Sequence, residues 1–125
     1  MKNVKNYIFI ASAMFLTSVA STQAATISGV IKGAQCYLKN TQCIESKDDP
    51  HLALENDFIL VSGSEYYFLP NLPRREKIKI YNQTVSVEGN ISKNKINVNK
   101  VMSKLGNKDK IIWDWNEIQN DLYEG

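Results

Sequence analysis

The chain has 125 residues, of which 43% are hydrophobic and 22% charged, and its formal net charge is +2. This ordinary composition excludes collagen-like, coiled-coil and strongly disordered proteins. The length accommodates one domain and excludes a TIM barrel, a dinucleotide-binding enzyme with a second domain, and a membrane protein with several spans.

The N-terminal segment has the layout of a secretory signal peptide. Lys2 and Lys5 provide positive charge, residues 7–20 form an uncharged run of 14, and residues 22–24 offer a small-x-small cleavage site. A membrane-spanning helix needs about 20 apolar residues, so an uncleaved anchor is the less favoured alternative. We predict a cleaved signal peptide at residues 1–24 and a periplasmic or secreted protein with no stable membrane span.

Cleavage would change the charge balance. The signal segment holds two of the 15 basic residues and none of the 13 acidic ones, so the remaining chain would be neutral. Binding to nucleic acid phosphates needs clustered positive charge. The sequence therefore predicts no nucleic acid partner.

Two cysteines, Cys36 and Cys43, follow the signal segment. In an oxidising compartment a single pair favours a disulfide, which here would close an eight-residue loop and contribute about 2–3 kcal/mol of stability. A metal site, a redox pair and an intermolecular bond are the alternatives. The six intervening residues differ from the two of a C-x-x-C redox motif.

His51 is the single histidine and follows Pro50 in a polar segment, which predicts a surface loop. A Ser-His-Asp or Cys-His arrangement would have to use this residue. The chain contains no P-loop, G-x-G-x-x-G, H-E-x-x-H or G-x-S-x-G motif. We predict a protein that is not an enzyme, with no catalytic residues, metal ligands or cofactor.

Alternation and turn signals predict a mainly β domain. Strands are expected at residues 26–34, 58–62, 65–69, 84–91 and 95–101. Gly63-Ser64 and Lys93-Asn94 supply tight turns between consecutive strands. Gly29 indicates a bend in the first strand. Five short strands of this kind favour a small closed or partly closed barrel.

Apolar residues in the C-terminal segment recur with a helical spacing instead of strand alternation. Its apolar residues at spacings of 4, 3 and 4 are Ile111, Trp115, Ile118 and Leu122. They predict an amphipathic helix, for which Asn107 or Asp109 would be the N-cap. The helix either packs on the barrel, with Trp113 at its margin, or docks a partner through Trp113 and Trp115.

Four segments resemble a group of small exported bacterial proteins with an OB-like barrel. They are residues 27–31 (Ile-Ser-Gly-Val-Ile), 36–39 (Cys-Tyr-Leu-Lys), 85–91 and 95–101. The resemblance implies a five-stranded OB-like barrel at residues 25–102 with a Cys-Tyr-Leu turn after the first strand. It does not extend to residues 103–125, the expected linker and amphipathic helix. The group often carries a His before a second close Cys pair, whereas this chain has only Cys43 there.

This architecture suggests a function in binding. OB folds bind along strands two and three and the adjacent loops. Tyr66 and Phe68 should point to one side of the third strand and Tyr67 and Leu69 to the other, so Tyr66, Tyr67 and Phe68 are the candidate binding face. Ordinary core packing of these rings is the alternative.

We predict a non-enzymatic module that binds a small ligand or protein partner in the bacterial envelope. The other hypotheses are an accessory subunit docking through its C-terminal helix, and a Cys/His metal-binding or redox protein.

Overall fold

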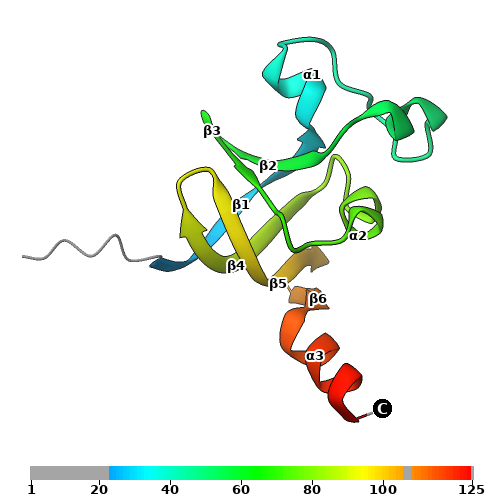
Figure 1. Cartoon of the computed structure of the whole chain (residues 1–125). Coiled ribbons are helices and arrows are strands. Elements are labelled where there is room, and N and C mark those ends of the chain that lie inside the picture. The colour runs from blue at the N-terminus through cyan, green and yellow to red at the C-terminus, as the bar shows by residue number, and fades with distance from the viewer. Residues whose placement is uncertain (1–22, 106–107, 125) are drawn as a thin grey trace, which may run out of the picture.

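The computed structural model describes residues 23–105 and 108–124, and in them six strands form one mainly antiparallel sheet. The strands are β1 (Gln23–Gly33), β2 (Phe58–Ser62), β3 (Glu65–Phe68), β4 (Thr84–Ser92), β5 (Lys95–Leu105) and β6 (Lys108–Asp114). The helices are α1 (Ala34–Leu38), the 3-10 helix η1 (Pro50–Leu54), α2 (Arg74–Lys79) and α3 (Trp115–Glu124). Figure 1 shows α1 and α3 at opposite ends of the molecule.

Five of the strands form a ring. The order along the sheet is β3-β2-β1-β4-β5-β6, and a parallel pairing of Phe68 with Lys95 joins β3 back to β5. The mainly β class, the local disulfide pairing and the C-terminal helix are confirmed. The ring has five strands, but the structure adds a sixth strand that was not expected, since β6 pairs with residues 100–105 of β5.

Few hydrogen bonds close the ring between β3 and β5. The backbone N–H of Phe68 donates to the carbonyl of Asn94 over 2.6 Å. After β3 ends, the side chain of Asn71 makes two further hydrogen bonds to the backbone of β5. Its Nδ2 donates to the carbonyl of Val98, its Oδ1 accepts from the Val98 N–H, and both distances are 2.7 Å.

We expect Asn71→Ala to lower the free energy of unfolding by about 1–3 kcal/mol, because a backbone donor and acceptor on β5 lose their partner. Asn97→Ala is the matched control, since Asn97 is exposed on the same strand. Urea unfolding followed by circular dichroism measures both. Equal, small losses in the two variants would show that the Asn71 bridge does not stabilise the ring.

Gly29, where the sequence predicts a bend, lies next to the point where β1 changes its pairing partner from β4 to β2. Residues of β1 up to Val30 pair with β4, and those from Val30 onward pair with β2. A Cβ atom at position 29 would lie 2.4 Å from the backbone oxygen of Val61, so only glycine allows β2 to approach this closely.

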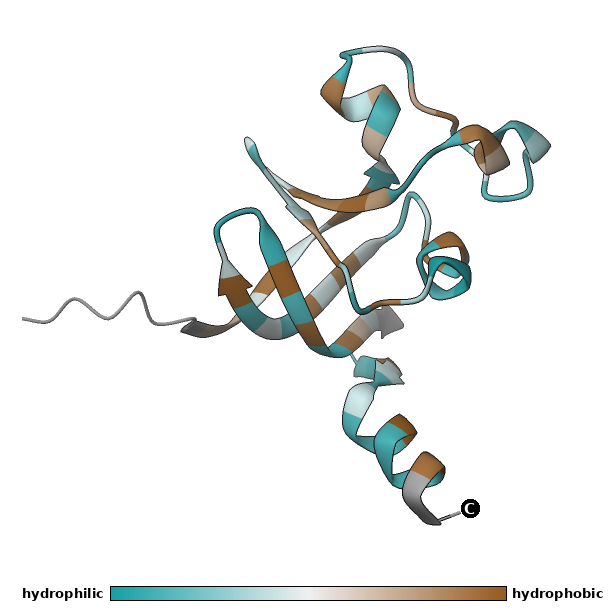
Figure 2. Cartoon of the chain, viewed as in Figure 1, coloured by the Kyte–Doolittle hydropathy of each residue, from teal (hydrophilic) through white to brown (hydrophobic). Residues whose placement is uncertain are grey.

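The core lies inside the ring and follows the alternation of the strands. Val85 and Val87 on β4, and Ile96 and Val98 on β5, are buried, while the residues between them are at least partly exposed. Figure 2 shows this alternation as brown and teal bands along β5. Burial of such side chains contributes about 1.5–3 kcal/mol each, so the period-two pattern fixes which face of each strand turns inward.

The C-terminal segment departs from its expected structure. Residues 108–114 form β6, and the helix begins only at Trp115, where Asp114 Oδ1 accepts a hydrogen bond from the Asn116 N–H over 2.9 Å. Ile111 therefore belongs to a strand and not to the helical stripe. Asp109 is paired on β6, and the other cap candidate, Asn107, lies outside the described residues. Pairing with the long β5 overrides the local helical spacing, and the expected boundary between residues 102 and 103 falls inside β5.

The expected signal peptide lies almost wholly outside the described residues, which start at Gln23. The expected cleavage point after Ala24 falls within β1, where Gln23 and Ala24 pair with Ile91 and Asn90. In the part of the chain that the structure describes, no helix has the length and apolar character needed to cross a membrane.

Candidate functional site

The loop between β1 and β2 is held in place by a disulfide and a helix cap. Cys36 and Cys43 are joined, with their Cα atoms 5.1 Å apart, which confirms the expected pairing. The expected Cys-Tyr-Leu turn is the short helix α1. The carboxylate of Glu55 accepts from the N–H groups of Gln35 and Cys36, at 2.9 and 3.3 Å. This cap and the disulfide fix the position of Tyr37, which follows Cys36.

Three aromatic side chains form a row on the outside of the ring, which we call the aromatic band. Tyr66 and Phe68 lie on β3, two residues apart and therefore on one face, with ring centroids 6.0 Å apart. Tyr37 of α1 lies 5.9 Å from Tyr66. All three are partly exposed. The band thus brings together two elements that are distant in the sequence.

Tyr67 lies apart from the band. Its side chain is buried on the inner side of β3, and its hydroxyl donates to Glu65 over 2.6 Å. This hydrogen bond to a carboxylate, with a smaller effect of burial, raises the pKa of Tyr67, so the phenol stays protonated. Of the three residues expected on the binding face, the structure places Tyr66 and Phe68 on the outside and Tyr67 in the core.

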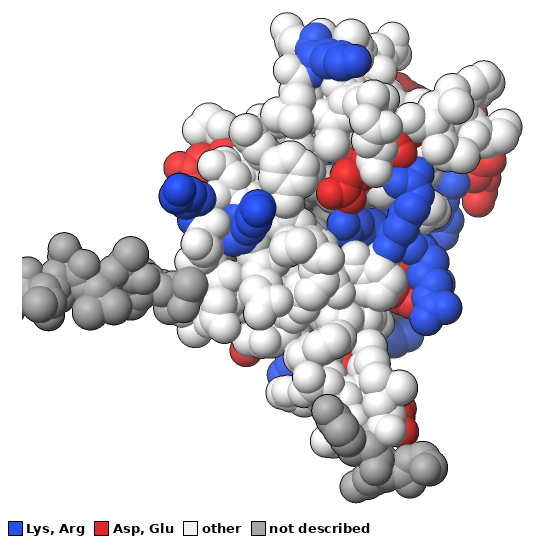
Figure 3. Space-filling model, in the orientation of Figure 1, with Lys and Arg blue, Asp and Glu red and all other residues white. Residues whose placement is uncertain are grey.

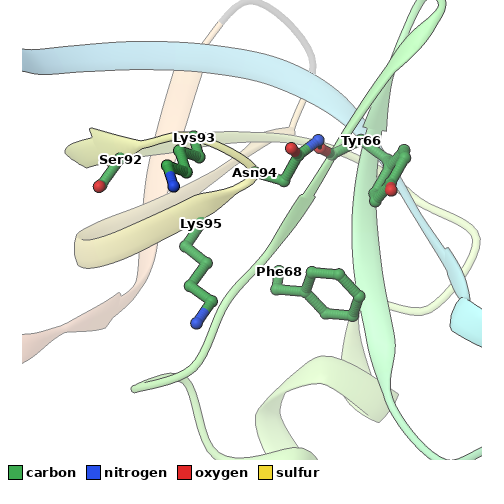
Figure 4. Close-up of a pocket in the computed structure, with 6 residues that line it drawn as sticks. All are labelled: Tyr66, Phe68, Ser92, Lys93, Asn94 and Lys95. Carbon is green, nitrogen blue, oxygen red and sulfur yellow. Dashed lines mark hydrogen bonds between the residues drawn. The ribbon is translucent and has the colours of Figure 1, made fainter.

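Three hollows adjoin the band. Tyr66 and Phe68 line the first together with residues 92–95 of the β4–β5 hairpin. Figure 4 shows Tyr66 and Phe68 on one side of this hollow and the two lysines on the other, with Asn94 between them. Tyr37 and Tyr66 line the second hollow, and Leu38 and Phe68 line the third. Leu38 is 49% exposed and extends the apolar surface.

The charged groups around the band are mainly basic. Lys39, which follows α1, and both Lys93 and Lys95 of the hairpin are exposed. Asp57 lines the third hollow, but its carboxylate pairs with Lys77 at 2.8 Å. Figure 3 shows blue side chains near α1 and at the β4–β5 hairpin, with red side chains next to the latter and a mostly uncharged surface between. The acidic Glu65 is exposed at the start of β3. This surface is therefore suited to a ligand that carries negative charge together with apolar groups.

Asn94 fixes the hairpin against the band. Its carbonyl accepts from the Phe68 N–H, and its side-chain Nδ2 donates to the Tyr66 carbonyl over 3.2 Å. The preceding Lys93 has a positive φ of 55°, as the tight turn requires. The two lysines are thereby held beside the aromatic rings on a short and well-anchored turn.

The polar residues considered for catalysis lie elsewhere. His51 is exposed on η1, and its Nδ1 lies 2.8 Å from Asp49 Oδ1. Asp49 also accepts from the His51 N–H, and this backbone hydrogen bond is the main reason that the pKa of Asp49 is lowered. Asp49 is thus the cap of η1. Among the described residues, no group of three or more His, Cys, Asp or Glu side chains is arranged to hold a metal ion.

The two tryptophans proposed for docking form a separate pair on β6 and α3. Their ring centroids are 5.9 Å apart. Trp113 is 7% exposed and packs in the core, whereas Trp115 is partly exposed. A buried Trp113 offers a partner little surface, so only Trp115 keeps the exposure that docking requires.

Comparison of the chain with protein-family models, curated proteins and solved structures gave no match. The site is therefore assigned from its geometry. Sequence reasoning missed Tyr37, Leu38 and the two hairpin lysines as parts of it. The alternation along β3 located Tyr66 and Phe68, but no local pattern indicates that Tyr37, 29 positions earlier, contacts Tyr66.

Proposed function

We propose that this protein is an exported, non-enzymatic binding module with an OB-type barrel. In this proposal the aromatic band binds an acidic segment of a protein partner in the bacterial envelope, through that segment's large apolar side chains. The observation that carries the proposal is the band itself, a row of partly exposed rings with hollows beside it and lysines around it.

The topology supports an OB-type barrel. Five strands close in the order β1-β2-β3-β5-β4, and α2 connects β3 to β4. The band lies on β3 and on the loop between strands one and two, and the loop between strands four and five lines the hollow beside it. In OB folds these two loops border the binding face. The disulfide supports a protein that leaves the cytoplasm.

The ring orientations favour side chains of a protein over bases or sugars. Neighbouring rings of the band are inclined at 61° and 84° to each other. Successive bases stack best on rings that present parallel faces. Rings set edge to face form ridges with hollows between them, which accept branched or aromatic side chains.

The charges favour an acidic segment. Among the residues that the structure describes, Asp57 is the one carboxylate in the lining of these hollows, and it is paired with Lys77. An acidic partner would gain long-range attraction to these lysines, and the attraction should weaken as salt is added.

Selection of 12-residue peptides from a random phage-displayed library on the oxidised protein tests this proposal. We expect the enriched peptides to combine Asp or Glu with Leu, Phe or Trp. Tyr66→Ala should weaken their binding at least tenfold, a loss of about 1.4 kcal/mol. Tyr66→Phe is the control that keeps the ring, and it should change affinity by less than about threefold.

Circular dichroism of both Tyr66 variants checks that the fold is intact. Peptides that are basic, or that bind Tyr66→Ala as tightly as the unaltered protein, would contradict the proposed site. A loss of binding that occurs only together with unfolding would make Tyr66 a core residue.

A further inference from the structure

We propose that two copies of this chain associate by placing α3 of each copy in a groove between α2 and β6 of the other. The inference concerns the end of the molecule away from the aromatic band and does not depend on the function proposed for that band. It rests on a groove that isoleucine and lysine side chains line together, and on an acidic amphipathic helix in the same chain.

Isoleucine and polar side chains line the groove together, and the polar ones include Gln83 and Ser103. Ile80 at the end of α2, and Ile111 and Ile112 of β6, line it. Ile111 is 48% exposed. Lys79 and Lys110 also line it.

The positive charge of the groove exceeds its negative charge. Glu76 also lines the groove, but its carboxylate contacts both Arg75 and Lys79, at 3.7 and 3.2 Å. Lys110 and Arg75 are exposed. Figure 3 shows blue side chains gathered over and beside α2.

Helix α3 has the complementary character. Its apolar residues Trp115, Ile118 and Leu122 recur at spacings of three and four, so they share one face. Trp115 and Ile118 pack partly against the core, whereas Leu122 is 75% exposed. In Figure 2 the brown segments of α3 recur on one side of the helix, which projects away from the ring. The exposed acids Glu117 and Asp121 lie together on one flank of the helix, outside this stripe.

The position of the two features allows a reciprocal contact. Ile111 and Ile112 precede the first residue of α3 by only a few positions, so groove and helix lie at the same end of the molecule. A two-fold axis near this end would place both helices in both grooves at once, which is the usual symmetry of a homodimer. Opposite charges would then meet at the edges of each contact.

Sedimentation equilibrium of the full exported chain tests the inference. We expect a monomer–dimer equilibrium with a dissociation constant between about 1 and 100 µM. Leu122→Asp should weaken it at least tenfold. The matched control is Leu54→Asp, since Leu54 is 73% exposed on η1, and it should leave the equilibrium unchanged.

A charge exchange identifies the occupant of the groove. One variant carries Glu117→Lys and Asp121→Lys, and the other carries Lys79→Glu and Lys110→Glu. We expect each variant alone to be monomeric at concentrations where the unaltered chain dimerises, and an equimolar mixture of the two to dimerise again. Only mutual docking of helix and groove restores both charge pairs in the mixture.

Two results would overturn the inference. The first is a chain that stays monomeric up to about 1 mM, which would leave the groove without a second copy as its occupant. The second is a dimer that persists in both charge variants separately, or that Leu54→Asp disrupts as strongly as Leu122→Asp. Circular dichroism of each variant confirms that it is folded.

Discussion

Replacement of Trp113 by alanine is expected to lower the free energy of unfolding by about 3–5 kcal/mol. Trp113 is 7% exposed and packs in the core from β6, so its removal leaves a large cavity. The free energy of unfolding of natural domains is about 5–15 kcal/mol. Losing about 3–5 kcal/mol of it therefore threatens folding at 37 °C. Urea unfolding of Trp113→Ala measures the effect.

Trp115 provides a matched control for this experiment. It lies beside Trp113 but is partly exposed at the start of α3. We expect Trp115→Ala to cost about 1–2 kcal/mol, since less apolar surface returns to water. If Trp113→Ala costs no more than Trp115→Ala, then β6 is not part of the cooperatively folded unit, and its tryptophan is free to serve as a contact residue.

Phe58→Ala is expected to cost a similar 3–5 kcal/mol. Phe58 is fully buried on β2, where its ring lies edge-on to Tyr81 with the centroids 5.6 Å apart. The guanidinium of Arg74 lies 4.9 Å from the ring centroid and also donates to the Glu55 carbonyl over 2.8 Å. Phe58 therefore joins β2, α2 and the segment after η1, and truncation removes contacts with all three. Thermal unfolding followed by circular dichroism measures the loss.

Phe68→Ala is the matched control on the neighbouring strand. Phe68 pairs with Ile59 across β2 and β3, but its ring lies in the partly exposed aromatic band. We expect a loss of stability of about 1 kcal/mol, together with a loss of peptide binding. The opposite pattern, in which Phe68→Ala unfolds the protein and Phe58→Ala does not, would contradict the placement of the two rings.

The sequence predicted the parts of this fold that depend on neighbouring residues. Gly63 and Lys93 both adopt positive φ in turns between paired strands, as expected from their tight-turn sequences. Alternation along β4 and β5 predicted which residues are buried, because each strand has one face inside the ring. The disulfide was predictable because the sequence leads us to expect export, and two nearby cysteines in an oxidising compartment usually pair.

The missed features depend on contacts between distant segments. The spacing of Ile111, Trp115 and Ile118 satisfies a helix, but residues 108–114 gain more from hydrogen bonds along β5 than from a helical turn. Tyr37 reaches Tyr66 only because the cap by Glu55 and the disulfide fix α1 beside β3. Hydrophobic periodicity is judged over short stretches of sequence, and neither arrangement leaves a pattern within such a stretch.

The most direct test of the proposed binding site is a titration of the ¹⁵N-labelled protein with an acidic library-selected peptide, followed by two-dimensional NMR. We predict the largest amide shift changes at Tyr37, Tyr66, Phe68 and Lys93, and their loss in Tyr66→Ala. Shift changes concentrated on β6 and α3, or none at peptide concentrations that saturate binding, would contradict the assignment of the aromatic band as the binding face.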